Sequence, residues 1–344
     1  MTVTPSPSNS PVPAPTGRGP AAGTGASFST ILGKFGPVFG LLFVILLFGS
    51  LRPASFLNWD NAQLILLQTA VVGTAALGMT LIIISGGIDL SIGSNIAFCT
   101  VIIATLLAKG YPPFVAALGG VVSSALCGLF IGILITRPKL SPFIVSLGMW
   151  GALRGLAKGA AKETMVIAPS TDLNNLLTAL SPSQRWMIVP PGVWMMLVLA
   201  VLVSLMLRNT RFGRHVFAIG SNEQTARLCG VPVERTKLLI YTLGAMFAGL
   251  AGVLQFSYLT VGDPTTATGY ELSAIAAVVI GGASLAGGQG SVFGTIIGAL
   301  IMTSVGVGCT KLDLPNWVQE IVTGAIIVFA VMLDRFRRNP GKTG

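Results

Sequence analysis

The sequence predicts an all-α, polytopic membrane protein of about ten transmembrane helices, at about 20 residues per span. Of its 344 residues, 52% are hydrophobic and only 9% are charged, and its mean hydropathy is +0.81. Soluble domains carry about 25% charged residues. The composition therefore excludes an ordinary soluble enzyme, a disordered protein and the usual kind of nucleic-acid binder. The formal charge of +10 is attributed to cytoplasmic loops, where membrane proteins concentrate Lys and Arg.

Three regions are predicted along the chain. Residues 1–27 are rich in Pro, Ser, Gly and Ala without apolar periodicity, which predicts a disordered cytoplasmic tail. Residues 28–335 form the transmembrane domain, and residues 336–344 form a basic cytoplasmic tail. Ten apolar segments are expected, at 36–51, 62–85, 90–108, 114–136, 141–157, 189–207, 236–259, 271–286, 290–309 and 317–333.

Segments five and eight are the least regular, yet both must cross the membrane if most basic residues are to lie on its cytoplasmic side. The fifth contains Gly151, Arg154 and Gly155, and the eighth has about 16 residues, where a span usually needs 17–25. Removing the fifth would place the basic loop 208–237 outside the cell. Removing the eighth would place the basic tail outside. Either result breaks the positive-inside rule, so ten crossings with both termini cytoplasmic are predicted.

Two further patterns fit a helical bundle in lipid. Tryptophans fall at predicted outer ends of spans, where an amphipathic ring prefers the headgroup level: Trp59, Trp186, Trp194 and Trp317. Small residues recur every fourth position in three spans: Gly120, Ser124, Gly128 and Gly132; Gly244, Ala248 and Gly252; Gly290, Gly294 and Gly298. Such stripes favour static close packing of helices, with a moving interface as the alternative.

No arrangement of residues for catalysis is present. The sequence contains no HExxH or GxSxG motif, and its four cysteines lie far apart, so no metal site, disulfide or cofactor is expected. Asp89 and Glu271 each begin a span and are interpreted as caps for free backbone N–H groups. The alternative, a proton relay, would need a carboxylate in mid-membrane with partners. The segment Leu285–Gln289, LAGGQ, is interpreted as a glycine-rich turn.

The loop 208–237 is predicted to contain a short helix over about 222–229. Ser221 and Gln224 have capping-box spacing, Gly230 suits the position just after a helix, and Pro232 prevents continuation. A helix this short is marginal alone, so we expect it to dock, either on its own bundle or on another subunit. Glu223 and Arg227 are spaced i, i+4 and are expected to remain available to a partner.

Long blocks of this sequence resemble the permease subunits of ribose-type monosaccharide ABC importers, over residues 60–335. The blocks are GGIDLSIGS, SPFIVSLGMWGALRGLA, FGRHVFAIGSNEQTARLCGVPVERTKLLIYTLGAMFAGLAGVL and TATGYELSAIAAVVIGGASLAGGQGSVFGTIIGAL. The resemblance implies a multi-pass protein of the bacterial cytoplasmic membrane that is not itself an enzyme. Its partners would be an ATPase subunit that hydrolyses ATP, an extracytoplasmic sugar-binding protein and a second permease copy, identical or related. No nucleic acid is expected.

The resemblance also places the ATPase-coupling helix, at Asn222, Glu223, Arg227 and Gly230. Gln224 and Thr225 stand where related importer loops have two alanines, and Gly230 comes one place late. The sequence does not identify the sugar, for which ribose and xylose are examples. Polar residues inside spans are candidates for its path, with hydrogen bonding inside the bundle as the alternative for each: Gln68, Asn95, Thr100, Gln255 and Tyr258. The alternative function is a stand-alone secondary transporter or facilitator.

Overall fold

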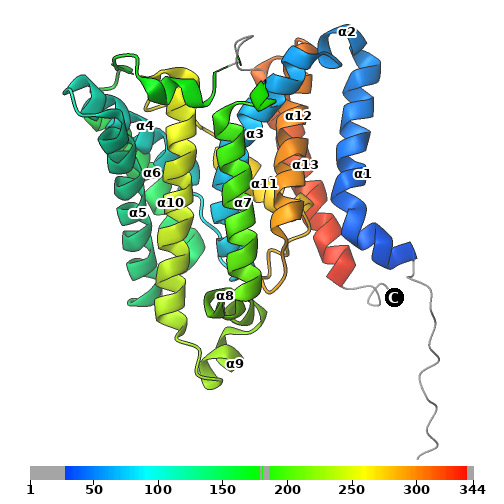
Figure 1. Cartoon of the computed structure of the whole chain (residues 1–344). Helices are drawn as coiled ribbons and strands as arrows, with labels where there is room; N and C mark the ends of the chain where they lie inside the picture. Colours follow the sequence, from blue (N-terminus) through cyan, green and yellow to red (C-terminus); the bar gives the residue numbers. More distant parts are fainter. Residues whose placement is uncertain (1–27, 179, 181–185, 339–344) are drawn as a thin grey trace, which may run out of the picture. The chain divides into compact units, whose positions relative to one another are not determined.

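The computed structural model describes residues 28–178, 180 and 186–338, and Figure 1 shows it. The described residues from Pro37 onward belong to one compact unit, and those up to Gly36 belong to another. The following description concerns the larger unit. The predicted tail 1–27 lies outside the described residues, as do residues 339–344.

The described chain is almost entirely helical, which confirms the predicted class. Its elements are α1 (Phe28–Leu51), α2 (Pro53–Phe56), α3 (Trp59–Ile84), α4 (Ile92–Ala108), α5 (Pro113–Thr136), α6 (Pro142–Ala160), β1 (Val166–Ile167), the 3-10 helix η1 (Asp172–Leu176), α7 (Pro191–Asn209), α8 (Arg211–Ser221), α9 (Glu223–Leu228), α10 (Val233–Leu259), β2 (Val261–Gly262), α11 (Tyr270–Ile280), α12 (Val292–Lys311) and α13 (Asn316–Arg338). The strands β1 and β2 pair antiparallel, with Val166 opposite Gly262, and connect the loop after α6 to the end of α10.

Each predicted apolar segment contains one helix, and the helix of the eighth segment is short. Within the described residues, α3, α5, α7, α10 and α12 are long and apolar enough to cross a membrane, and α1, α4, α11 and α13 contain shorter apolar stretches. Helix α6 fills the fifth segment with 19 residues. Helix α11 has only 11 residues, or about 16 Å at 1.5 Å per residue, so it reaches about halfway across a hydrocarbon core of about 30 Å.

The rest of the eighth segment is a turn. Gly282, Gly287 and Gly288 in it have positive φ angles, which end a helix and prevent it from restarting before α12. The sequence-based expectation of a helix through residue 286 is therefore wrong after Ile280, while the interpretation of Leu285–Gln289 as a glycine-rich turn is confirmed. The multi-pass helical class is clear, and the number of crossings stays a prediction.

Helix α3 lies at the centre of the bundle. The most apolar 18-residue window of this helix is 94% buried, and its apolar residues share one core cluster with residues of α7, α10, α11 and α12. The outer helices instead expose large apolar side chains, such as Phe43 on α1, Phe114 on α5 and Phe329 on α13. Such faces are compatible with lipid, where exposed hydrocarbon carries no hydrophobic penalty.

The small-residue stripes lie where helices approach closely. A Cβ atom added to Gly128 of α5 would collide with Ala245 and the Tyr241 carbonyl group of α10. A Cβ atom added to Gly298 of α12 would collide with the Ala277 backbone of α11. These contacts support static close packing.

Three of the predicted interfacial tryptophans begin helices at one end of the bundle. Trp59 opens α3, while Trp194 and Trp317 lie in the first turns of α7 and α13, and all three are exposed. Figure 1 shows α2 at this end and α8 and α9 at the opposite end. This arrangement fits the predicted aromatic positions at the outer surface.

Candidate functional site

The short helix predicted in the basic loop is present as α9. Its N-terminal cap is Asn222, whose side-chain oxygen accepts a hydrogen bond from the Thr225 amide at 2.9 Å. The expectation that Ser221 would cap it is wrong, because Ser221 is the last residue of α8. Asn and Ser are equally good caps, and adjacent candidates cannot be separated by spacing alone.

The C-terminal end of α9 follows the predicted pattern. Gly230 has φ +82°, the left-handed conformation that glycine adopts without steric cost. The Gly230 amide donates to the Arg227 carbonyl at 3.1 Å, and the Val231 amide donates to the Ala226 carbonyl at 3.0 Å. These two bonds form a Schellman motif. Pro232 then precedes the first residue of α10, so α9 has fixed ends and leads directly into a long buried helix.

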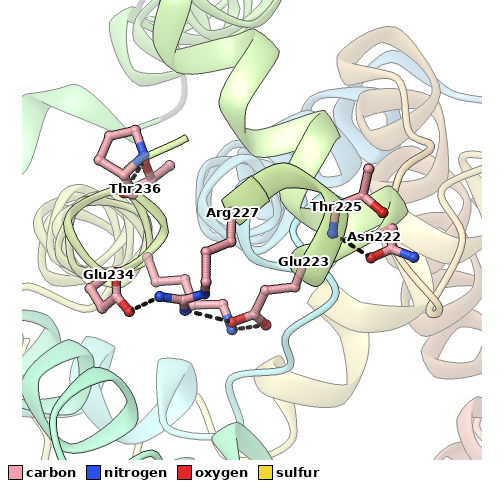
Figure 2. A network of polar contacts seen from close by, with 8 residues as sticks. Asn222, Glu223, Thr225, Arg227, Glu234 and Thr236 are labelled. Carbon is pink, nitrogen blue, oxygen red and sulfur yellow. Dashed lines mark hydrogen bonds and ion pairs between the residues drawn. The ribbon is translucent and has the colours of Figure 1, made fainter. Parts of the chain in front are cut away.

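The charges of α9 are already paired with α10, as Figure 2 shows. Glu223 accepts a hydrogen bond from the Lys237 ammonium group at 2.6 Å and lies 3.6 Å from Arg227. Arg227 also pairs with Glu234, and this hydrogen bond raises the pKa of the Arg227 guanidinium. Glu223 and Arg227 therefore pair with each other and with α10, and their availability to another subunit stays a prediction. Exposed ion pairs contribute little net stability, so a partner could exchange them at small cost.

Sequence reasoning missed the helix that precedes α9, so α9 is not the only short capped helix of the loop. Helix α8 begins after Thr210, whose hydroxyl accepts a hydrogen bond from the Gly213 amide at 3.1 Å. Its buried residues Val216 and Ile219 face the bundle, while Arg211 and Arg214 are exposed. The signal was available, because a Thr cap followed by apolar residues at i, i+3 or i+4 spacing predicts an amphipathic helix.

Leu228 is the second feature that sequence reasoning missed. It is 88% exposed at the end of α9, whereas the other large apolar residues of the loop 208–237 are buried or half-buried. A cavity of about 590 Å³ adjoins α9 and is lined by residues from several elements: Ser85, Gly86, Ile219, Gly220, Ser221, Asn222, Glu223, Gln224, Arg227, Lys237 and Ala286. A single exposed leucine is common on protein surfaces, so the support for a contact at Leu228 comes from the position of α9.

The candidates for a solute path divide into two groups. Asn95, Thr100 and Gln255 are buried, and each has a hydrogen bond inside the bundle. Their partners are the Ser124 carbonyl at 3.5 Å, the Ala97 carbonyl at 2.8 Å and the Thr266 hydroxyl at 2.8 Å, respectively. Gln68 is half-buried and Tyr258 is 39% exposed, and no hydrogen bond in the described chain joins either to the other three.

An additional polar cluster lies beside Gln255. The Trp150 indole donates to the Glu271 carboxylate at 3.2 Å. Arg154 donates to the carbonyl groups of Pro264 and Thr266 at 2.9 and 2.7 Å. The cluster therefore connects α6 to the loop between α10 and α11, and the partners are more than 100 residues apart in sequence.

Both carboxylates interact with backbone N–H groups at the start of a helix, as the capping interpretation predicts. Asp89 accepts hydrogen bonds from the Ser91 amide at 2.8 Å and hydroxyl at 2.6 Å, just before α4. Glu271 lies in the first turn of α11, where its carboxylate interacts with the backbone of Gly269 and of Glu271 itself. The Glu271 side chain also accepts a hydrogen bond from Trp150 on another helix.

Comparison with known proteins identifies the class of this bundle. The family described as branched-chain amino acid transport system / permease component matches residues 61–331. The chain therefore belongs to this family of membrane permease components.

Several relatives are named as sugar permeases. The ribose import permease protein of Bacillus subtilis (strain 168) is 36% identical over 312 residues, covering 90% of this chain and 94% of that protein. The L-arabinose ABC transporter permease protein of Azospirillum brasilense is 34% identical, covering 88% and 87%. The D-allose transport system permease protein of Escherichia coli (strain K12) is 33% identical, covering 90% and 94%. No solved structure matches the chain significantly.

Proposed function

We propose that this chain is the membrane-spanning permease subunit of an ATP-binding cassette importer for a monosaccharide. Relatives named for ribose, L-arabinose and D-allose support the sugar class, and they match nearly the whole chain. The protein supplies the path and its alternating access, and a separate ATPase subunit hydrolyses ATP. A secreted sugar-binding protein delivers the solute at the outer surface of the bacterial cytoplasmic membrane.

The geometry of α9 carries the proposal for ATP coupling. Both helix ends are fixed, by Asn222 and Gly230, so the helix moves as a unit. Leu228 extends from it into water, and the chain enters α10 within five residues of the helix end. A displacement of α9 by a bound ATPase is therefore passed to a helix that packs in the core. Asn222, Glu223, Arg227 and Gly230 are the residues assigned to this coupling.

A second permease copy is proposed to face α6. The exposed side of α6 contains Gly148, Gly151, Gly155 and Gly159, and an added Cβ atom at each would meet nothing within 4 Å. Helix α6 also exposes Ile144, Leu147 and Leu156, as α1, α5, α7 and α13 expose large apolar residues, so it is the open glycines that set α6 apart. Small residues let another helix approach closely, so two copies would meet through their α6 helices, with the path beside this contact.

Asn95, Thr100 and Gln255 are proposed to lie near this path rather than at its surface, since each is buried. Thr100 and Gln255 are bonded to the loop between α10 and α11, and Asn95 is bonded to α5. Gln68 and Tyr258 are weaker candidates because no described hydrogen bond connects them to that loop.

Reconstitution tests the proposed function directly. The chain is co-expressed with the ATPase subunit and the binding protein from neighbouring genes, placed in proteoliposomes, and assayed with ribose, arabinose, xylose and allose. We expect uptake of at least one sugar only with ATP on the ATPase side. Uptake without ATP that follows an ion gradient would support a secondary transporter instead.

The contact with the ATPase is tested by a variant of α9. Leu228→Asp should reduce co-purification of the ATPase, because it places a charge in an apolar contact. The matched control, Leu57→Asp, alters an exposed leucine between α2 and α3, outside the spans and at the end of the bundle opposite α9, and should leave that contact intact.

A further inference from the structure

We propose that Trp150, Arg154 and Glu271 form a contact site that binds hydroxyl groups of the monosaccharide during its passage and so contributes to selectivity in the permease itself. The inference rests on the proposed function, because it requires that a sugar passes beside α6. Without this site, the sugar selectivity of the importer would be assigned to the binding protein alone.

The three side chains have the chemistry that sugar recognition requires. The indole of Trp150 offers a flat apolar face and one N–H donor, the Arg154 guanidinium offers planar donors, and the Glu271 carboxylate accepts. A sugar presents C–H faces together with hydroxyl groups that both donate and accept, so it can use all three groups at once. These three side chains therefore match a solute with several hydroxyl groups, such as a monosaccharide.

Several buried polar atoms of the cluster make no hydrogen bond. Within the described chain, Arg154 Nη2, Glu271 Oε2 and Gln255 Oε1 are buried without a hydrogen-bond partner. Glu271 as a residue is only 7% exposed. Buried polar groups in native proteins are nearly always bonded, and each exception needs an explanation. A transient ligand that bonds these atoms in another state of the cycle supplies one.

The carboxylate and the guanidinium do not form an ion pair in the described structure. Arg154 uses Nη1 for the carbonyl groups of Pro264 and Thr266, while Glu271 interacts with Trp150 and with the backbone of its own helix start. The two charges attract each other, and Asp263 also attracts Arg154, but no direct hydrogen bond joins Arg154 to Glu271 in the described chain. Arg154 Nη2 and Glu271 Oε2 are therefore a donor and an acceptor available to a third group.

The most exposed member of the cluster is Trp150, which is 38% exposed. Trp150 and Arg154 lie on the side of α6 that faces α11 and the loop before it, away from the open glycines. A solute that reaches this side of α6 would meet the indole first. Gln255 is connected to the same loop, because Thr266 receives its amide while the Thr266 carbonyl receives Arg154.

The test is a double-mutant cycle between protein and sugar. In the reconstituted importer with saturated binding protein, uptake of the best-transported sugar among ribose, arabinose, xylose and allose is compared with uptake of its deoxy analogues, each lacking one hydroxyl. Glu271→Gln, Arg154→Lys and Trp150→Phe are assayed beside wild type. The matched controls are Glu320→Gln on α13 and Trp194→Phe, which also loses an indole donor, to the Met187 carbonyl.

We expect each cluster variant to slow uptake of the parent sugar three- to tenfold, the range of a single hydrogen bond. Uptake of the one analogue that lacks the contacted hydroxyl should be unaffected by the same variant. The controls should show no such coupling. Equal slowing of the parent sugar and every analogue, or no slowing at all, would refute the site and leave a structural link between α6 and the loop.

Two further outcomes are distinguishable. If wild type shows no ATP-dependent uptake of any of the four sugars, the proposed function itself fails. If Glu271→Gln does not assemble with the ATPase, Trp150→Phe tests the sugar contact instead, since it keeps an aromatic ring on α6 and removes the indole N–H donor.

Discussion

Gly230 fixes where the coupling helix ends. Its φ of +82° lies in a region that costs a β-branched residue about 1–2 kcal/mol, and its amide closes the last turn of α9 onto Arg227. An added Cβ atom would meet nothing within 4 Å, so the cost of substitution is conformational and local. The ten-segment bundle should therefore tolerate changes here.

We predict that Gly230→Val lowers both sugar uptake and sugar-stimulated ATPase activity, while membrane levels of the permease stay normal. Gly230→Asn should retain more of both activities, because Asn tolerates the left-handed conformation. Uptake, ATP hydrolysis and membrane abundance are measured in parallel. Equal activity of wild type and Gly230→Val would show that α9 does not depend on this turn.

At the residue scale, the sequence predicts local features better than distant ones. The turn at Gly230 and Pro232 has strong local signals, and the structure follows them. The exposure of Leu228 and the hydrogen bond from Trp150 to Glu271 have no such local signal, because both depend on how distant segments of the chain pack together. The latter joins residues 121 positions apart, and no periodicity encodes such a contact.

Helix α6 differs from every other long helix in the described unit by its open glycine face. Gly151, Arg154 and Gly155 make it an irregular span in sequence, and its hydropathy does keep it out of the strongly apolar set. The structure explains Arg154, which is used within the protein rather than exposed to lipid. By contrast, the predicted length of the eighth segment failed, since apolar content alone does not show that glycines end α11 early.

We predict that Gly151→Leu prevents close approach of a second copy. Transport and disulfide cross-linking between two copies carrying Ala152→Cys should both fall, because the added side chain fills the open face of α6. The control is Gly324→Leu on α13, where an added Cβ atom also meets nothing within 4 Å. Undiminished cross-linking in Gly151→Leu, or equal losses in both variants, would argue against α6 as the contact between copies.

Over the whole molecule, the predicted orientation places α8 and α9 in the cytoplasm. The basic residues of the loop 208–237 and the tryptophans at the opposite end both favour this arrangement. Cys229 is exposed beside α9, whereas Cys99 and Cys309 are buried, so the chain carries its own reporter of sidedness.

We predict that a membrane-impermeant maleimide labels Cys229 only after the cells are opened. In a Cys229→Ser background, Thr265→Cys should instead be labelled in intact cells, because Thr265 is exposed in the loop between α10 and α11 at the predicted outer surface. Blotting for mass-tagged protein gives the extent of labelling. Modification of Cys229 in intact cells would reverse the orientation.

The coupling between ATP hydrolysis and sugar uptake is the central claim, and one measurement tests it most directly. Both rates are followed in the same proteoliposomes, containing permease, ATPase and binding protein, with the sugar that wild type transports. We predict that uptake requires ATP, survives ionophores that collapse ion gradients, and is lost together with stimulated hydrolysis when Leu228 is changed to Asp. Uptake that continues without ATP and stops when ionophores are added would contradict the claim.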